Sequence, residues 1–251
     1  MKSIKFKKLD YQSMKSVTHV IYAHAFTDAQ LVYGYDGFKN VFEWLEFTIN
    51  FLLKDKKNKI LIKAHPSFFH KKFPNKNIIF DQKLFNSLYD KYKNNKQIII
   101  FKHPIKNVDL LKRLNKKTIL VSHHGSAILE ALHLGFKCIG STKTFWNKNL
   151  KLTNNWENIS EYKLNLKKDW SKLHFCNKSD LYDVCYQLFC DKFSLYGKKY
   201  WQQIISEELK IDRKSLYENS AKIFNDIKIE KKKFEKIVKN ISETILIKNM
   251  N

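Results

Sequence analysis

The chain has 251 residues, of which 43% are hydrophobic and 14% aromatic, and it carries a formal net charge of +23 at pH 7. This length accommodates one large domain or two small ones, and the aromatic content argues against an intrinsically disordered chain. The positive charge favours anionic partners, among them nucleic acid, phospholipid headgroups and nucleotide-activated sugars. The lysines are scattered along the sequence without a recognised nucleic-acid-binding module, so the charge alone does not indicate a specific nucleic-acid-binding protein.

No targeting or membrane-spanning segment is visible. The N-terminal stretch lacks the apolar core of a signal peptide, and the longest apolar run, residues 41–53, contains two glutamates and is too short to span a bilayer. The four cysteines lack any paired metal-ligand spacing, which indicates free thiols in a reducing compartment. We therefore expect a cytoplasmic protein whose basic surface allows peripheral contact with the cytoplasmic membrane.

Strand-like and helix-like segments alternate over residues 18–141. In chain order we expect a strand at 18–26, a helix at 38–52, a strand at 59–67, a helix at 81–94, a strand at 97–104, a helix at 107–115, a strand at 118–125, a helix at 126–135 and a strand at 137–141. The strands are continuous apolar runs, as in sheets covered on both faces. The alternation predicts an α/β fold with a doubly wound, mainly parallel, Rossmann-like sheet.

Smaller signals refine this outline. Asp36 precedes the first helix and could cap it, and Gly135 suits the left-handed residue that ends many helices. Residues 142–175 look irregular, and the pattern turns helical again from residue 178. We therefore expect a basic N-terminal lead-in at 1–17, a Rossmann-like domain at 18–175 and a C-terminal helical region at 176–251 that packs on it.

Polar residues stand at the exits of four expected strands. They are Asp28, His65, His103, His123, His124 and Ser126. Ligands of open α/β sheets bind beyond the carboxyl ends of the strands, where these exits meet. The sequence therefore predicts a polar site at the carboxyl edge of the sheet.

Gly125, Ser126 and Glu130 open the helix that follows the fourth strand. A helix N-terminus offers free N–H groups and a partial positive charge, and glycine lets a ligand approach the backbone. Ser126 either caps the helix or donates its hydroxyl to a phosphate oxygen. Glu130, one turn later, either accepts hydrogen bonds from ribose hydroxyls or belongs to ordinary helix surface. The position of the turn at a strand exit favours an anion site.

A His-Pro pair, His65–Pro66, ends the second expected strand. The imidazole can donate to a phosphate, and Pro66 would fix the turn that presents it. Lys63, two residues earlier on the same strand face, could add positive charge. The alternative is a histidine that only caps its loop. His103–Pro104 repeats the pair, so at least one copy could be structural.

Metal and nicotinamide chemistry are not indicated. The histidines at positions 65, 103, 123 and 124 lack an HExxH motif, a cysteine partner or a nearby carboxylate in sequence. A GxSxG nucleophile elbow, a Walker-A loop and a GxGxxG turn after the first strand are also missing. We therefore expect no metal and no cofactor.

Three segments together resemble a known family. IKAHPS at 62–67 and SHHGSAILEALHLGFKCIGS at 122–141 resemble the nucleotide-binding half of GT-B glycosyltransferases, within the bacterial capsule polysaccharide biosynthesis and Kdo-transferase group. The upstream AHAFTDAQLVYGYDGFKNVFEWLEFTI at 23–49 is similar to the beginning of that half. The resemblance covers roughly residues 18–145, and the order and spacing of the short motifs carry it.

The resemblance implies a role for each residue of the predicted phosphate site. His65 and Ser126 would contact the donor phosphate, Gly125 would allow its close approach, and Lys63 would neutralise charge. Glu130 would hold the ribose. Such enzymes stabilise the departing phosphate with helix N-termini and basic side chains rather than with a metal.

The remaining polar residues at the strand exits are weaker candidates. Asp28 would lie at the mouth of the cleft and is the candidate catalytic residue. His103, His123 and His124 are secondary candidates for donor binding.

The implied function is a glycosyltransferase, or its donor-binding half, in capsule or surface polysaccharide biosynthesis. The donor would be a nucleotide-sugar such as CMP-Kdo, and the acceptor a glycan or glycolipid. A GT-B enzyme has two Rossmann-like domains, whereas about 17 residues precede the first strand here, so a separate N-terminal half is an expected partner. Two alternatives stay open, a non-catalytic partner subunit of a longer transferase and a basic nucleic-acid-binding protein with salt-dependent binding.

Overall fold

The computed structural model describes residues 14–27, 36–69, 76–101, 105–144, 147 and 151–185. The chain divides into two compact units, Met1–Cys176 and Asn177–Asn251. In the second unit the described residues form the helix α8 (Lys178–Cys185), where the sequence predicts the start of a helical region. No helix in the described part of the chain is long and apolar enough to cross a membrane.

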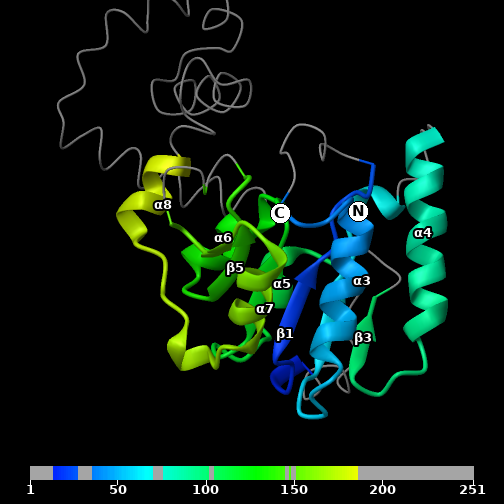
Figure 1. The fold of residues 1–251 in the computed structure, drawn as a ribbon, viewed down its shortest axis with the longest axis horizontal. Helices are drawn as coiled ribbons and strands as arrows, with labels where there is room; N and C mark the ends of the chain where they lie inside the picture. Colours follow the sequence, from blue (N-terminus) through cyan, green and yellow to red (C-terminus); the bar gives the residue numbers. More distant parts are fainter. Residues whose placement is uncertain are drawn as a thin grey trace, which may run out of the picture. The chain divides into compact units, whose positions relative to one another are not determined.

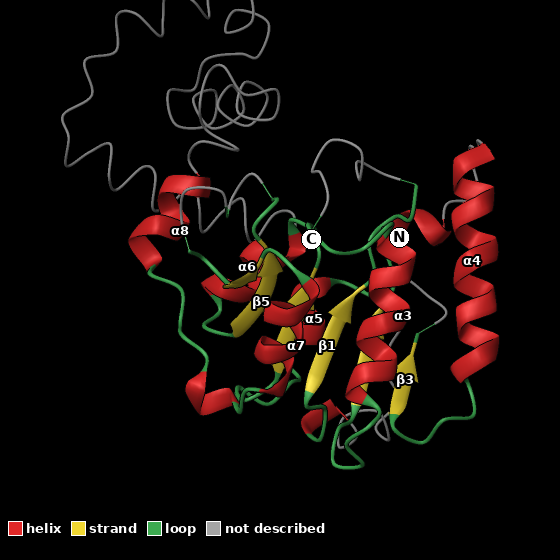
Figure 2. Cartoon of the chain, viewed as in Figure 1, coloured by secondary structure: helices red, strands yellow, loops and turns green. Residues whose placement is uncertain are grey.

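The first unit is built on a parallel sheet with helices on its faces (Figure 1 and Figure 2). Within the described residues its strands are β1 (His19–Tyr22), β2 (Ile60–Lys63), β3 (Ile98–Ile100), β4 (Ile119–Ser122), β5 (Lys137–Ser141) and β6 (Asn154–Trp156). Their order across the six-stranded sheet is β3-β2-β1-β4-β5-β6, and every neighbouring pair is parallel. This is the strand order of the Rossmann fold, so the predicted α/β class is confirmed.

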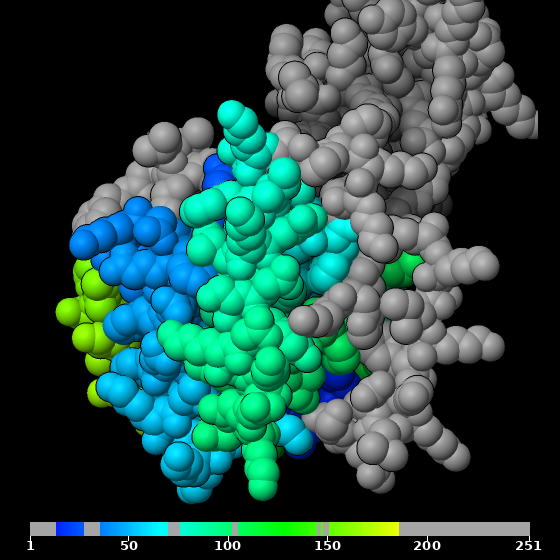
Figure 3. All heavy atoms as spheres, turned by 90° about the vertical axis from the view of Figure 1, so that its right-hand side faces the viewer, coloured from blue at the N-terminus to red at the C-terminus, as the bar shows by residue number. Residues whose placement is uncertain are grey.

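The helices cover both faces of the sheet. Their bounds are α3 (Val41–Leu52), α4 (Lys76–Tyr92), α5 (Asn107–Leu111), α6 (Ala127–His133) and α7 (Ile159–Lys167), with 3-10 turns at η1 (Pro66–Phe69) and η2 (Trp170–Lys172). Helices α3, α4 and α7 share one apolar core with Ile21, Ile62 and Val121 of the central strands. Figure 3 looks onto the outer face of α4, whose side chains lie beside those of α3. Helix α6 contacts β4 and β5, and it also packs on α5.

The central strands end at the same level. Tyr22 of β1 pairs with Lys63 of β2 on one side and with Ser122 of β4 on the other, and Ser122 pairs with Gly140 of β5. Because all strands run in the same direction, the residues that follow them meet at one edge. This register brings together the strand exits that the sequence singled out.

The capping prediction for Asp36 was wrong. Asn40 is the N-cap of α3, and its side-chain oxygen accepts the backbone N–H of Glu43 at 2.8 Å. The Glu43 carboxylate accepts the backbone N–H of Lys39 at 2.7 Å, which completes a reciprocal capping arrangement. Asp36 is fully buried and serves the site described below. The prediction for Gly135 is confirmed, because this residue has φ +78° after α6.

Residues 142–175, expected to be irregular, contain β6, α7 and η2. The short strand Asn-Asn-Trp has no apolar run, so its pairing with β5 supplies the extended structure that its sequence does not signal. Helix α7 starts at Asn158, whose side chain accepts the backbone N–H of Glu161 at 3.0 Å. Helix α4 also begins earlier than expected, at Lys76.

Gly37 provides a test of how closely the segment before α3 packs against the start of α7. Its φ of +107° is unfavourable for other residues, and a Cβ added there would lie 2.7 Å from Ile159 Cγ1. Gly135 also has a positive φ, but nothing lies within 4 Å of its added Cβ. We expect Gly135→Ala to cost about 1–2 kcal/mol of unfolding free energy from backbone strain, and Gly37→Ala to cost a further ~1–3 kcal/mol from overpacking. Urea unfolding of the two variants measures this difference, and equal losses would contradict the argument.

Candidate functional site

Three histidines meet where the strand order of the sheet reverses, between β1 and β4. His24 follows β1, His65 follows β2, and His124 follows β4. The ring centroids of His24 and His124 are 3.8 Å apart, and those of His24 and His65 are 5.4 Å apart. We call these three residues the histidine cluster. In open α/β sheets this reversal point is where ligands bind, so the cluster marks the candidate site.

His124 is the buried member of the cluster. Only 4% of the residue is exposed. Burial, and to a lesser extent charge repulsion from the neighbouring His24, His123 and His65, lowers the pKa of His124 to about 2. The ring is therefore neutral at physiological pH.

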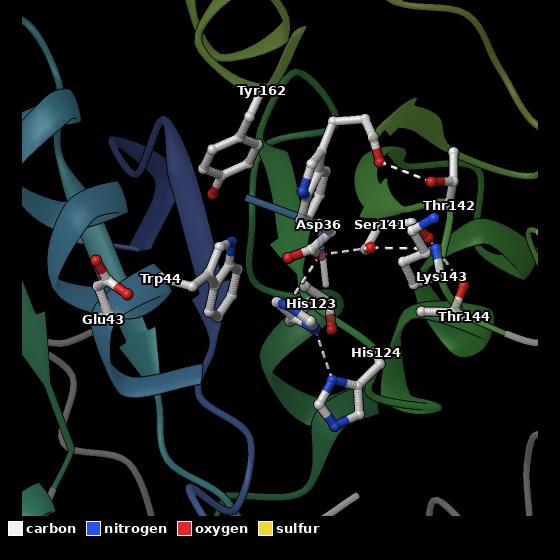
Figure 4. A network of polar contacts seen from close by, with 12 residues as sticks. Asp36, Glu43, Trp44, His123, His124, Ser141, Thr142, Lys143, Thr144 and Tyr162 are labelled. Atoms are coloured by element: carbon white, nitrogen blue, oxygen red, sulfur yellow. Dashed lines mark hydrogen bonds and ion pairs between the residues drawn. The ribbon is translucent and has the colours of Figure 1, made fainter. Parts of the chain in front are cut away.

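Behind His124 lies a buried carboxylate–imidazole pair (Figure 4). His123 Nδ1 and His124 Nδ1 are 2.7 Å apart, so one ring donates and the other accepts. His123 Nε2 lies 3.0 Å from Asp36 Oδ2. The Ser141 hydroxyl donates to the same carboxylate oxygen at 2.6 Å. Trp44 packs edge-on against His123, with 5.5 Å between the ring centroids.

This pair keeps Asp36 ionised inside the protein. Burial alone would raise the pKa of the carboxyl. The hydrogen bond and attraction of His123, together with hydrogen bonds from Ser141 and the backbone of Phe38, outweigh burial and lower that pKa. The carboxylate thereby ties the segment before α3 to the ends of β4 and β5.

His65 caps its own loop. The backbone N–H of Ser67 donates to His65 Nδ1 at 3.2 Å, and the Ser67 hydroxyl lies 2.7 Å from the same nitrogen. His65 therefore caps its loop through Nδ1, as the alternative interpretation of the sequence proposed. It is compatible with a ligand role, because a neutral ring that accepts at Nδ1 carries its proton on Nε2.

Ser126 and Gly125 adjoin the cluster. Ser126 occupies the N-cap position of α6, yet its side chain makes no capping hydrogen bond and the residue is exposed. A Cβ added at Gly125 would lie 3.2 Å from Ser122 Oγ and 3.6 Å from His24 Cδ2. The absence of a Cβ thus lets this turn pack closely against Ser122, while Ser126 remains exposed.

Glu130 and Lys63 form a separate polar group with Tyr22 and Asn107. The Asn107 side-chain amide donates to Glu130 Oε2 at 2.7 Å, and the Tyr22 hydroxyl donates to Asn107 Oδ1 at 2.9 Å. Burial raises the pKa of Glu130, opposed by the Asn107 hydrogen bond and the attraction of Lys63. Burial lowers the pKa of Lys63, and the attraction of the Glu130 carboxylate opposes this effect. Glu130 is therefore a partly buried, oriented carboxylate and not ordinary helix surface.

Two predicted residues, Asp28 and His103, lie outside the described residues. Conversely, the sequence reasoning missed His24 and the role of Asp36. The strand-exit rule that selected His65 applies equally to His24, which stands just beyond β1, so that residue could have been found. The contact of Asp36 with Ser141 joins positions 105 residues apart, and no local pattern signals it.

Among the described residues, no group of three or more His, Cys, Asp or Glu side chains is arranged to hold a metal ion. The described residues also line a pocket of about 750 Å³. It lies at the opposite edge of the sheet, beside the starts of β1 and β4. The convergence of the histidines, rather than pocket size, places the candidate site at the carboxyl edge.

Comparisons with known proteins leave the family open. No family model, no curated protein and no solved structure matches the chain. The fold and the site together define the class of protein: an α/β protein with a Rossmann-like sheet and a histidine-rich site at its switch point.

The Asp36–His123 pair predicts a large effect of one substitution. Asp36→Asn removes a buried charge that His123 and Ser141 satisfy, so we expect a loss of about 3 kcal/mol in unfolding free energy. Glu46→Gln is the control, because Glu46 pairs with Lys91 at the surface and such a pair contributes below about 1 kcal/mol. Urea unfolding compares the two variants, and similar losses would contradict the buried-pair argument.

Two buried neutral histidines predict acid sensitivity. Burial lowers the pKa of His19 to about 4, against the attraction of Asp55, while the pKa of His124 is about 2. An unfolded histidine has a pKa near ~6.5, so the unfolded state binds more protons between pH ~6.5 and ~4. Stability therefore falls as the pH falls through this window, by up to about 1.4 kcal/mol per pH unit for each ring.

The measurement is urea unfolding between pH 7.5 and 5. His19→Gln should reduce the pH slope, whatever it does to stability at neutral pH. A slope that is flat, or that His19→Gln leaves unchanged, would show that these rings do not govern acid sensitivity.

Proposed function

We propose that the protein binds a nucleotide-activated sugar at the carboxyl edge of its sheet and is a glycosyltransferase, or the donor-binding half of one. The observation that carries this proposal is the convergence of His24, His65 and His124 at the switch point of a Rossmann-ordered sheet. Nucleotide ligands of such sheets place their phosphates at this point. Imidazole and hydroxyl donors there suit a phosphate group.

The proposed reaction needs little from the protein beyond binding and charge stabilisation. An acceptor hydroxyl oxygen forms a bond to the anomeric carbon while the bond from that carbon to the donor phosphate breaks. The nucleoside phosphate leaves with the electron pair, and the hydroxyl proton is released. His65 Nε2–H and the Ser126 hydroxyl would stabilise the charge that develops on the departing phosphate.

Neighbouring residues fit accessory roles in this proposal. Glu130, oriented by Asn107, would accept hydrogen bonds from the ribose hydroxyls, and Lys63 would balance its charge. Gly125 would let the phosphate approach the turn before α6, and Asp28 remains the proposed catalytic residue. A glycan or glycolipid acceptor, a separate N-terminal half, and cytoplasmic action at the membrane surface in capsule or surface polysaccharide assembly belong to the same proposal.

Calorimetric titration of the full chain with CMP, UDP and GDP tests donor binding. We expect one nucleotide to bind with a dissociation constant below the millimolar range. Ser126→Ala and Glu130→Ala should each weaken it about tenfold, as expected when a charge-assisted hydrogen bond is lost. Ser160→Ala, an exposed serine in the first turn of α7, is the matched control and should leave the affinity unchanged. If none of the three nucleotides binds at millimolar concentration, the proposal is wrong.

Turnover separates an active enzyme from a silent partner. The full chain is incubated with the nucleotide-sugar of the nucleotide that binds and with an acceptor glycan. Released nucleoside phosphate would show that this chain catalyses transfer alone, whereas binding without turnover would favour the donor-binding subunit.

A further inference from the structure

The pocket at the opposite edge of the sheet has the dimensions of a ligand site. Its volume of about 750 Å³ falls within the range of small-molecule sites, roughly 300–1,000 Å³. The described residues that line it come from the ends of α3 and α7, from η2, and from the segments that lead into β1 and β4. All of them belong to the first unit, so the pocket is formed within one compact body.

Part of the lining is apolar. It consists of four buried aliphatic side chains and two partly buried aromatic side chains: Val17, Leu52, Ile119, Leu166, Phe51 and Trp170. Apolar ligand surface that is covered by such side chains contributes about 25 cal/mol per Å² to binding. The lining therefore favours an occupant with an apolar body over a small inorganic ion.

The charged part of the lining is mainly positive. Five lysines and two aspartates contribute to it: Lys15, Lys54, Lys117, Lys167, Lys168, Asp55 and Asp169. Lys54, Lys117 and Lys167 are exposed, and they form no ion pair with any residue that the structure describes. The carboxyl ends of α3 and α7 oppose the lysines with only about half an elementary charge each. The surplus of three positive charges among these side chains therefore favours an anion.

Two buried nitrogen atoms of lining residues provide a second, independent observation. His19 Nε2 and Trp170 Nε1 are buried and lack a hydrogen-bond partner in the described part of the chain. Only 6% of His19 is exposed, and its Nδ1 lies 3.0 Å from Thr18 Oγ1. Buried polar atoms of native proteins are nearly always paired, so these two atoms indicate that a polar ligand group is bound there.

We propose that this pocket binds a small amphiphilic organic anion. The apolar body of the ligand contacts the aliphatic and aromatic side chains, and its carboxylate or similar anionic group faces the lysines. The pocket lies where the strands begin, whereas the proposed nucleotide site lies where they end. The two sites therefore bind their ligands without competition, and the inference does not depend on the proposed function.

Calorimetric titration of the full chain with decanoate tests this proposal. Propionate keeps the carboxylate but has a short apolar body, and decyltrimethylammonium keeps the long body but carries the opposite charge. We expect decanoate to bind, and the other two compounds to bind at least about tenfold more weakly. The proposal is overturned if decanoate fails to bind at millimolar concentration, or if it binds no better than either comparison compound.

A matched pair of charge reversals tests the location of the anionic group. Lys54→Glu should weaken decanoate binding about tenfold, because it places a negative charge in the lining. Lys56→Glu makes the same change in net charge two residues away, at an exposed side chain outside the described lining, and should have a much smaller effect. Equal effects of the two variants would show that only the net charge matters and would overturn the site.

NMR locates the ligand independently of affinity. The indole N–H signal of Trp170, assigned with Trp170→Phe, should shift when decanoate is added, whereas the signal of the fully buried Trp44 should not. An unchanged Trp170 signal in the presence of bound decanoate would contradict the proposed site.

Competition with nucleotides separates this inference from the proposed function. Decanoate affinity should stay the same in the presence of CMP, UDP or GDP, and displacement of decanoate by a nucleotide would overturn the assignment of a separate site. If no nucleotide binds while decanoate does, the proposed function is wrong and this inference is supported.

Discussion

The buried contact of Asp36 with His123 and Ser141 is the constraint on which the rest of the site depends. It joins the segment before α3 to the ends of β4 and β5, and it does so with a single carboxylate oxygen. Because Asp36 is fully buried, losing His123 or Ser141 would leave its charge poorly compensated. His123 is thereby fixed, and through it the ring of His124, against which His24 packs.

The polar residues at the carboxyl edge of the sheet form two groups that differ in how their charges are compensated. In the histidine cluster the buried ring of His124 is neutral, and its neighbours His24 and His65 pack within ring-contact distance of one another. Lys63 and Glu130 lie in the other group, where each opposes the effect of burial on the other's pKa. The second group holds the Glu130 carboxylate in a fixed orientation through the Asn107 amide.

Much of the fold was predictable because a parallel sheet has a strong local signature. The apolar runs around β1, β2, β4 and β5 and the helical periodicity between them follow directly from burial on both faces. The stretch 142–175 was not predictable in the same way, since β6 is polar in sequence and becomes a strand only by pairing with β5. At the site, the exit rule found His65 and His124, whereas the partners of Asp36 are distant in sequence and needed the folded chain.

The sequence by itself determined the class of fold, the strand exits that carry histidines, and the glycine positions that end a helix or turn the chain. These are local properties, set by side-chain hydrophobicity and by backbone preferences of single residues. The tertiary structure decided which exits meet, that Asp36 serves His123 rather than a helix N-terminus, and which nitrogen of His65 carries the proton. A tautomer depends on which donor or acceptor stands beside each ring nitrogen, and only the folded backbone fixes that neighbour.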